Sequence, residues 1–228
     1  MKLMEVCKSI QNYGLQSGAI STIVRFGGCS LKPKDEPVPL TEVPADVLDV
    51  GPPFVLDKIL DLDPYPRHIF ISGGEPVEQP EHELFSLLQS LSGWCGVRGL
   101  ESVTVETHGH RDLRSLCDKP FRKIVNFCVN LRTLSSGCCG KMLKHNYKLL
   151  ISRDTVVCRC RTDNDYDWAV SFLTKVAQEI SCRPTVVFAS PDGEGKMWIA
   201  NRLTKENDFL RRYDVRVGLD VRRSFLAR

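Results

Sequence analysis

The stretch Val24-Arg25-Phe26-Gly27-Gly28-Cys29-Ser30-Leu31 joins an apolar, β-branched run to a glycine turn that carries a cysteine. A second apolar run, from Arg67 to Ser72, ends in the same way at Gly73-Gly74. Short apolar strands of this kind are typical of parallel sheets, whose ligand-binding residues gather at the carboxyl ends of the strands. The sequence therefore predicts a parallel sheet with its ligand-binding edge at the carboxyl ends of these strands.

Strand-like and helix-like segments alternate along most of the chain. Further strands are expected at Ser102 to Val105, Lys123 to Val129, Lys148 to Ile151, Thr185 to Ala189 and Asp214 to Leu219. Helical spacing of apolar residues follows Pro80, recurs from Ala169 to Ile180 and returns from Arg202 to Tyr213. This alternation predicts an α/β fold with a mostly parallel sheet and helices outside, either an open sheet or a partial (β/α) barrel.

Composition indicates an ordinary globular protein. The 228 residues are expected to form a single domain, residues 1–228, and the net charge is only +3. No apolar run reaches the ~20 residues of a membrane span, and the start of the chain has no apolar signal core. We therefore expect no membrane association, a cytoplasmic (intracellular) location and reduced thiols rather than disulfides.

The region from residue 31 to 53 interrupts the pattern. It contains six prolines, which do not fit the interior of a helix or of a central strand. No cysteine occurs between Ser30 and Trp94, so Cys29 has no partner thiol nearby in the sequence. We interpret residues 31–53 as a remodelled, proline-rich loop.

Four segments together resemble the 7-carboxy-7-deazaguanine synthase family of radical S-adenosylmethionine (SAM) enzymes. In order, they are Ser9-Ile10-Gln11-Asn12-Tyr13-Gly14-Leu15-Gln16-Ser17-Gly18, Arg25-Phe26-Gly27-Gly28-Cys29-Ser30-Leu31, Ser72-Gly73-Gly74-Glu75-Pro76-Val77-Glu78-Gln79 and Val105-Glu106-Thr107-His108-Gly109. Weaker similarities follow at Val129-Asn130-Leu131-Arg132 and Ser190-Pro191-Asp192-Gly193. The resemblance covers nearly the whole chain and implies a partial barrel of the radical SAM type.

The resemblance also implies a set of site residues. The SAM-binding motif would be Gly73, Gly74, Glu75 and Pro76, and the substrate pocket would be lined by Gln11, Arg25, Ser72, Gln79, Glu106 and Thr107. The residues alone leave simpler interpretations open. The Gly-Gly-Glu-Pro segment can be a tight turn, Arg25 an outward-facing strand charge and Glu106 a surface turn residue.

The chain departs from the family at several functional positions. Pro33 and Glu36 stand where two of the three cysteines that hold the [4Fe–4S] cluster are expected, which leaves Cys29 as a remnant ligand. Pro37-Val38 replaces the segment whose threonine binds magnesium in the family, and Tyr13 replaces a substrate-binding glutamate. Leu219-Asp220-Val221-Arg222 replaces a segment that closes the substrate pocket. We expect the cluster and the magnesium site to be lost, and no resident metal or cofactor, with SAM binding left open.

Other cysteines could in principle rebuild a metal site. Cys138-Cys139 and Cys158-Arg159-Cys160 are two pairs, but adjacent cysteines and C-x-C do not match the usual zinc spacings. Free thiols are the simpler interpretation, and a metal site at these pairs stays open.

Three functions remain as hypotheses. The first is a degenerate synthase-like protein without a cluster. It would be a non-catalytic binding, regulatory or structural component with a protein partner or as a homodimer, and a purine-like or adenosyl ligand is an option within this hypothesis. The second is an active radical SAM enzyme of 7-deazaguanine (queuosine-type) biosynthesis with a non-standard cluster. The third uses the basic segment from Ile199 to Arg228, with eight Arg/Lys against four Asp/Glu, for nucleic acid. Low aromatic content makes the third the weakest, and the first is preferred.

Overall fold

The computed structural model describes residues 1–34, 47–180, 182–190 and 195–218. Glu36, Pro37-Val38, Pro191-Asp192-Gly193 and Leu219-Asp220-Val221-Arg222 therefore lie outside the described residues. Within the described part, no helix is both long and apolar enough to cross a membrane.

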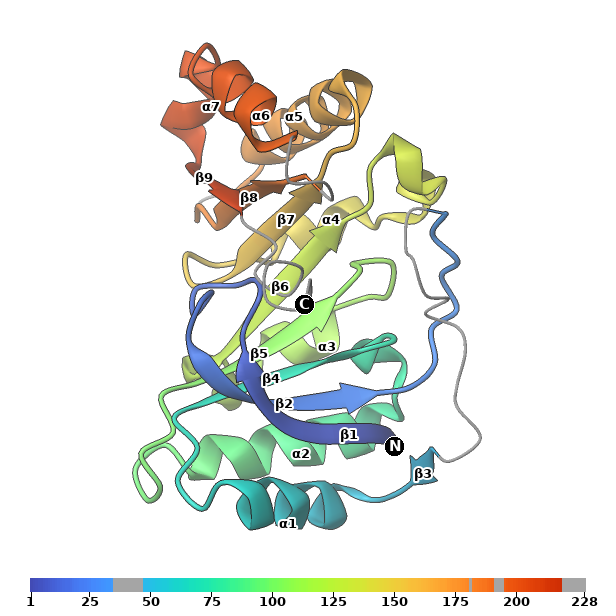
Figure 1. Cartoon of the computed structure of the whole chain (residues 1–228), viewed down its shortest axis with the longest axis vertical. Helices are drawn as coiled ribbons and strands as arrows, with labels where there is room; N and C mark the ends of the chain where they lie inside the picture. Colours follow the sequence, from blue (N-terminus) through green and yellow to red (C-terminus); the bar gives the residue numbers. More distant parts are fainter. Residues whose placement is uncertain (35–46, 181, 191–194, 219–228) are drawn as a thin grey trace, which may run out of the picture.

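Among the described residues, nine strands form one sheet in the order β3-β1-β2-β4-β5-β6-β7-β8-β9. From β2 to β9 every neighbouring pair is parallel, whereas β1 runs antiparallel to β2 and to β3 (Figure 1). The strands are β1 Lys2–Ile10, β2 Ile20–Phe26, β3 Leu48–Asp49, β4 His68–Gly73, β5 Ser102–Thr107, β6 Val125–Leu131, β7 Thr155–Arg159, β8 Thr185–Ala189 and β9 Asp214–Gly218. The predicted α/β fold, with a mostly parallel sheet and helices outside, is confirmed.

Helices connect the parallel strands and cover one face of the sheet. They are α1 Pro52–Leu62, α2 Glu81–Gly93, α3 Arg114–Cys117, α4 Lys144–Lys148, α5 Asp163–Ala177, α6 Gly195–Leu203 and α7 Asn207–Arg212. The described connections also contain short 3-10 turns: η1 Pro76–Glu78, η2 Pro120–Lys123, η3 Leu134–Ser136 and η4 Cys139–Lys141. In Figure 1, α1 and α2 lie at the β1–β4 end of the sheet, and α5, α6 and α7 lie at the β8–β9 end.

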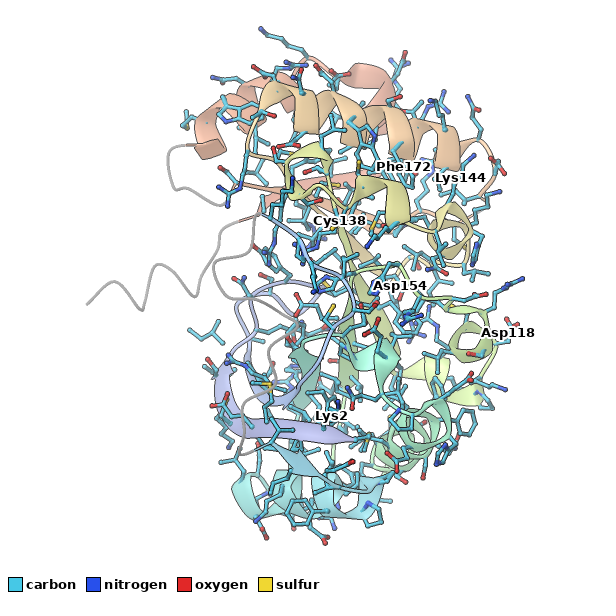
Figure 2. All side chains as sticks on the ribbon, turned by 90° about the vertical axis from the view of Figure 1, so that its right-hand side faces the viewer. Lys2, Asp118, Cys138, Lys144, Asp154 and Phe172 are labelled. Atoms are coloured by element: carbon cyan, nitrogen blue, oxygen red, sulfur yellow. The ribbon has the colours of Figure 1, made fainter. Side chains whose placement is uncertain are left out.

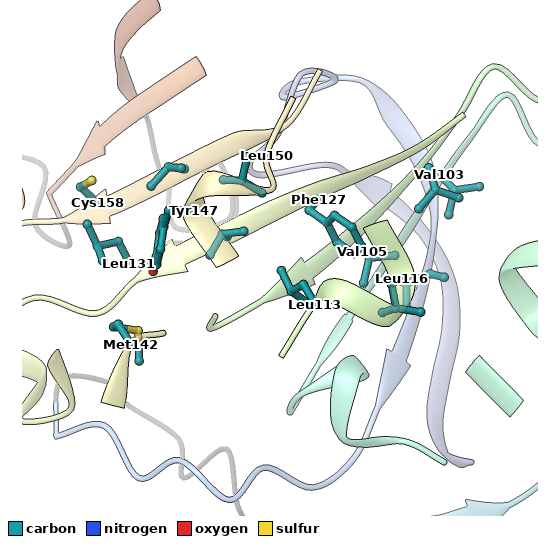
Figure 3. Packing of buried hydrophobic residues seen from close by; sticks show 14 of the residues in the cluster. Val103, Val105, Leu113, Leu116, Phe127, Leu131, Met142, Tyr147, Leu150 and Cys158 are labelled. Atoms are coloured by element: carbon teal, nitrogen blue, oxygen red, sulfur yellow. The ribbon is translucent and has the colours of Figure 1, made fainter. Parts of the chain in front are cut away.

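Alternation along the strands separates an apolar outer face from a polar inner face. The outer residues pack under the helices in one continuous core, part of which is seen in Figure 3. Strand residues of this core include Val24, Phe26, Ile69, Ile71, Val103, Val105, Phe127, Val129, Val156, Cys158, Val186 and Phe188. The opposite, inner face carries a smaller apolar cluster, the buried residues Ile23 and Phe70, and several polar residues.

A buried ion pair supports the amino-terminal ends of β6 and β7. Asp154 is fully buried and accepts hydrogen bonds from Arg122 Nη1 (3.1 Å) and Nη2 (2.6 Å) (Figure 2 labels Asp154). The same carboxylate accepts from the backbone N–H groups of Phe127 (2.7 Å) and Ile151 (2.8 Å). These bonds compensate the desolvation of the two charges and fix the start of both strands.

Several predicted elements differ from the structure. The prediction of a strand from Lys148 to Ile151 is wrong. Lys148 ends α4, and the chain then turns through a bond from Ile151 N–H to the Asp154 carboxylate. The next strand, β7, begins only at Thr155. The helix expected from Arg202 to Tyr213 is two helices, α6 and α7. The proline-rich region contains β3, and Pro52 and Pro53 begin α1, where proline is tolerated in the first turn.

Candidate functional site

Five polar side chains lie on the inner face toward the carboxyl ends of successive parallel strands. They are Arg25 on β2, Ser72 on β4, Glu106 on β5, Asn130 on β6 and Arg159 on β7. Strand register places Arg25 beside Ser72 and keeps the others on the same face by alternation. This edge of a parallel sheet is where ligands usually bind.

Glu106 is the centre of this polar row. Its side chain is buried, and the carboxylate accepts hydrogen bonds from Ser72 Oγ (2.5 Å) and Asn130 Nδ2 (2.9 Å). A buried carboxylate with two positioned donors is held in one orientation, as a binding group must be. The structure thus brings together two of the predicted pocket residues, and it rules out an exposed turn position for Glu106.

Arg25 lies at the open end of the row. Its guanidinium pairs with Glu5 on β1, with 3.2 Å between Nη1 and Oε2, and 39% of its side chain is exposed. The pair is therefore on the uncovered face of the sheet and in contact with solvent. Gln11 is fully buried, and its amide nitrogen donates to the Tyr13 carbonyl (2.7 Å) and lies 3.5 Å from Thr104 Oγ1 on the inner face of β5.

Tyr13 packs on the inner face of the sheet over β6, β7 and β8. The residue is 3% exposed, and the Arg159 guanidinium lies 5.5 Å from the centre of its ring. Its apolar neighbours come from β6, β7 and β8: Cys128, Val157, Val187 and Ala189. An aromatic ring thus occupies space over β6–β8, where the family resemblance implies a polar substrate-binding residue.

The Gly-Gly-Glu-Pro segment packs closely against the turn that follows β2. A Cβ on Gly73 would lie 2.1 Å from the Phe26 carbonyl oxygen, and one on Gly74 would lie 2.2 Å from that of Gly28. Gly73 also has a φ of +111°, which favours glycine. The two glycines are therefore required by the close approach of the turn that follows β2, and Pro76 then begins η1.

Glu75 is fully buried at this turn. Its carboxylate accepts from the backbone N–H groups of His108 (2.8 Å) and Val77 (3.1 Å). Burial raises the pKa of Glu75 to about 7, although these hydrogen bonds act in the opposite direction. The carboxylate is thus engaged by the protein itself.

Gln79 and Thr107 form hydrogen bonds within the turns at the carboxyl ends of the strands. Gln79 donates to the Gly27 carbonyl (3.1 Å) and accepts from Lys2 N–H (2.8 Å), which links the turn after β4 to the turn after β2 and to the start of β1. Thr107 Oγ1 accepts from Gly109 N–H (3.2 Å), and strand alternation directs Thr107 away from the inner face. These two predicted pocket residues are therefore not part of the polar row.

Cys29 lies beside a carboxylate and an imidazole. One ligand atom from each of Cys29, Glu78 and His110 lies within 4.8 Å of the other two, and this is the one group of three potential metal ligands found among the described residues. Burial raises the pKa of Cys29 to about 12. Burial acts to raise the pKa of Glu78 as well, but hydrogen bonds from Ser30, His110 and Arg111 lower it to about 2.

The loop that carries His110 is held by one side chain of α4. Asn146 is fully buried, and its amide nitrogen donates to the carbonyls of Gly109 (3.0 Å) and Arg111 (2.6 Å). Its amide oxygen accepts from Leu113 N–H (3.0 Å). The position of His110 is therefore set by tertiary contacts on both sides of it.

The other paired cysteines occupy different surroundings. Cys158 and Cys160 are fully buried in the core, where burial raises the pKa of each thiol far above its usual range. Cys138 contacts the loop after Cys29, since its thiol donates to the Lys32 carbonyl (3.4 Å) (Figure 2 labels Cys138). Cys139, its neighbour, is partly buried.

Sequence reasoning missed Glu78 and did not assign a role to His110. Their positions in the chain were the available indication: Glu78 lies in the turn after β4, which pairs with β2, and His110 lies in the turn after β5, which pairs with β4. Asn130 and Arg159 were also missed, because only the strand register reveals that they share a face of the sheet with Glu106.

Comparison with known proteins gives two informative matches, although no model of a protein family matches the chain. The 7-carboxy-7-deazaguanine synthase of Methanospirillum hungatei is 26% identical over 172 residues, which covers 74% of this chain and 65% of that protein. The chain thus matches slightly less than two thirds of that relative's length. The crystal structure of QueE from Escherichia coli superposes with a TM-score of 0.63, at 16% identity, over 96% of this chain and 94% of that one.

The structural match shows the shared fold, and the sequence match shows a similarity to a 7-carboxy-7-deazaguanine synthase over 74% of this chain. Together they identify the chain as a divergent relative of the 7-carboxy-7-deazaguanine synthase family.

Proposed function

We propose that this chain is a synthase-like protein that does not run the cluster-dependent reaction and instead binds a purine-like or adenosyl ligand, as a component of a larger assembly or a homodimer. The observation that carries the proposal is the surroundings of Cys29. A [4Fe–4S] cluster of this class is held by three thiolates. The ligand atoms grouped with Cys29 belong to a glutamate and a histidine, and Pro33 has no donor.

The inner face supports the binding part of the proposal. Glu106 is held by two donors and can accept an N–H of a heterocycle, while Arg25 and Arg159 supply positive charge on either side. The relative from Methanospirillum hungatei is named for a 7-deazaguanine product, which suggests the ligand class. Tyr13 argues for a changed ligand or a changed pose, because its ring takes space over β6–β8.

Iron reconstitution tests the loss of the reaction. We expect the protein to stay colourless after anaerobic expression and treatment with iron and sulfide. A brown protein with stoichiometric iron that cleaves SAM to 5′-deoxyadenosine would overturn the proposal.

Calorimetry tests the binding. We expect 7-carboxy-7-deazaguanine or SAM to bind, and Glu106→Gln to weaken that binding about tenfold or more, since a hydrogen bond to a charged group contributes about 1.5–3 kcal/mol. Glu101→Gln is the matched control, because Glu101 precedes the same strand but pairs with Arg67 on the surface. Equal affinity of the two variants would contradict a role for Glu106.

A second candidate is an active radical SAM enzyme with a non-standard cluster. It is favoured by one contact, that of the Cys138 thiol with the loop after Cys29. If the reconstituted protein does bind iron, Cys138→Ser should abolish that binding under this candidate, whereas Cys95→Ser, at an exposed thiol, should not.

A further inference from the structure

Three adjacent strands present Cys29, Glu78 and His110 at the same edge of the sheet. Cys29 follows β2, Glu78 ends the turn after β4, and His110 lies in the turn after β5. One ligand atom of each lies within 4.8 Å of the others. Ligands of a tetrahedral zinc ion stand about 3.2–3.8 Å apart, given metal–ligand distances of about 2.0–2.3 Å. A contraction of about 1 Å would therefore bring the three atoms onto one ion.

The two nitrogens of His110 provide an independent indication of a ligand. The side chain is 7% exposed, and Nε2 lies 2.9 Å from Glu78 Oε1. Nδ1 is buried without a hydrogen-bond partner, 3.6 Å from Glu75 Oε2. If Nε2 keeps its proton for Glu78, Nδ1 is left as a buried acceptor that faces a carboxylate, which is unfavourable.

A metal ion on Nε2 resolves this conflict. The proton then resides on Nδ1 and faces Glu75, which gives the carboxylate–histidine–metal arrangement common in metalloproteins. Nε2 and Glu78 Oε1 are already at a separation close to that of two ligands on one ion. The orphaned nitrogen thus points to the same site as the grouping of the three side chains.

We propose that Cys29, Glu78 and His110 bind one Zn²⁺ ion. A thiolate, an imidazole and a carboxylate are a donor set that suits zinc and excludes a preference for magnesium or calcium, which take oxygen ligands. This inference rests on the proposed loss of the iron–sulfur cluster, since Cys29 cannot serve both.

Access to the site comes from the side of Glu78. Glu78 and Arg111 line a surface groove of about 510 Å³. Arg111 Nε lies 2.8 Å from Glu78 Oε1, and its side chain is half-exposed, so it can move into the groove when a cation replaces its charge. Three protein ligands leave a fourth position for water or a small ligand, as in zinc sites that perform chemistry.

Cobalt titration of the full-length, EDTA-treated protein is the direct test, because Co²⁺ replaces Zn²⁺ and reports its ligands by absorption. We expect one equivalent of Co²⁺ to give a thiolate-to-cobalt charge-transfer band and Zn²⁺ to remove it. Cys29→Ser should lose the band. Glu78→Gln and His110→Gln should weaken binding at least as much as the tenfold to hundredfold, roughly, that loss of an outer-shell partner costs.

Cys95→Ser is the control for the thiol and should behave as the wild type, because Cys95 is exposed and lies outside the site. Far-UV circular dichroism checks that each variant is folded, and a Zn²⁺-dependent rise in melting temperature that is absent in His110→Gln gives a second readout. Failure of the wild type to bind Co²⁺, or an unchanged band in Cys29→Ser, would overturn the zinc proposal while the iron-free result still stood. Cluster assembly in the reconstitution experiment would instead overturn the proposed function.

Discussion

Replacement of Gly74 by alanine tests whether the Gly-Gly-Glu-Pro turn exists for packing or for a ligand. The added Cβ would lie 2.2 Å from the Gly28 carbonyl oxygen and 2.6 Å from its carbon. Both are backbone atoms and cannot rotate aside, so the turn after β4 and the turn after β2 must separate. The bonds from Gly74 N–H to the Phe26 carbonyl (2.7 Å) and from Glu75 N–H to the Gly28 carbonyl (2.9 Å) join these turns and would weaken.

The expected cost follows from these contacts. Overpacking costs about 1–3 kcal/mol, and each weakened hydrogen bond adds about 0.5–1.5 kcal/mol. Gly74→Ala should therefore lower the free energy of unfolding by about 2–6 kcal/mol, a large part of the roughly 5–15 kcal/mol of a typical domain. Urea unfolding followed by circular dichroism measures this loss.

Gly93→Ala is the matched control. Gly93 ends α2, and a Cβ there would meet nothing within 4 Å. Since alanine is the better helix former, we expect that variant to be unchanged or more stable by up to about 1 kcal/mol. The packing explanation would be refuted if Gly74→Ala lost less than about 1 kcal/mol yet bound SAM more weakly than the wild type.

Two further predictions concern buried carboxylates away from the site. Asp154→Asn should destabilise the protein by about 3–5 kcal/mol, because the buried Arg122 loses its charged partner. Asp112→Asn, which breaks an exposed pair, should cost less than about 1 kcal/mol in the same urea assay. Equal losses of stability in the two variants would contradict the expected difference between a buried and an exposed ion pair. Burial acts to raise the pKa of Asp165, but hydrogen bonds, chiefly those from Ser135 N–H (2.8 Å) and Oγ (2.6 Å), leave it below its usual value. Its ionised form therefore stabilises the fold above about pH 4, and this contribution is lost as the pH falls through the lowered pKa. The stability difference between wild type and Asp165→Asn should shrink with acidification from pH 6 to about pH 3, and a constant difference would show that Asp165 does not titrate in this way.

Most of the sheet was predictable because the local sequence of most strands indicates a strand. The runs that became β2, β4 and β8 are apolar and β-branched, and alternation assigns their faces. The strand expected at Lys148 failed because local apolar residues do not reveal that Asn146 holds this segment as a helix through bonds to residues far away in the sequence. Strand β1 was missed because its residues are mostly exposed or half-buried and lack a continuous apolar run.

The candidate site, too, was predictable from the sequence only in part. Glu106 and Ser72 were predictable from motifs and do lie together. The role of Gly73 and Gly74 was not, because it depends on how closely the turn after β2 approaches them. The grouping of Cys29 with His110 depends on two loops separated by 80 residues of chain, whose convergence follows only from strand order. Glu36, one of the two positions where the family has a further cluster cysteine, lies in residues 35–46, outside the described part of the chain.

The three bonds of Asn146 have a consequence for the dynamics of the loop from Gly109 to Leu113. Because Gly109, Arg111 and Leu113 all bond to this buried side chain of α4, opening the loop separately from the helix requires breaking three hydrogen bonds. The amide proton of Leu113 should therefore exchange with solvent about as slowly as those of the central strands, through global rather than local unfolding. A ligand that reaches His110 would meet a preformed surface, and its association should follow simple one-step kinetics without a slow closing phase.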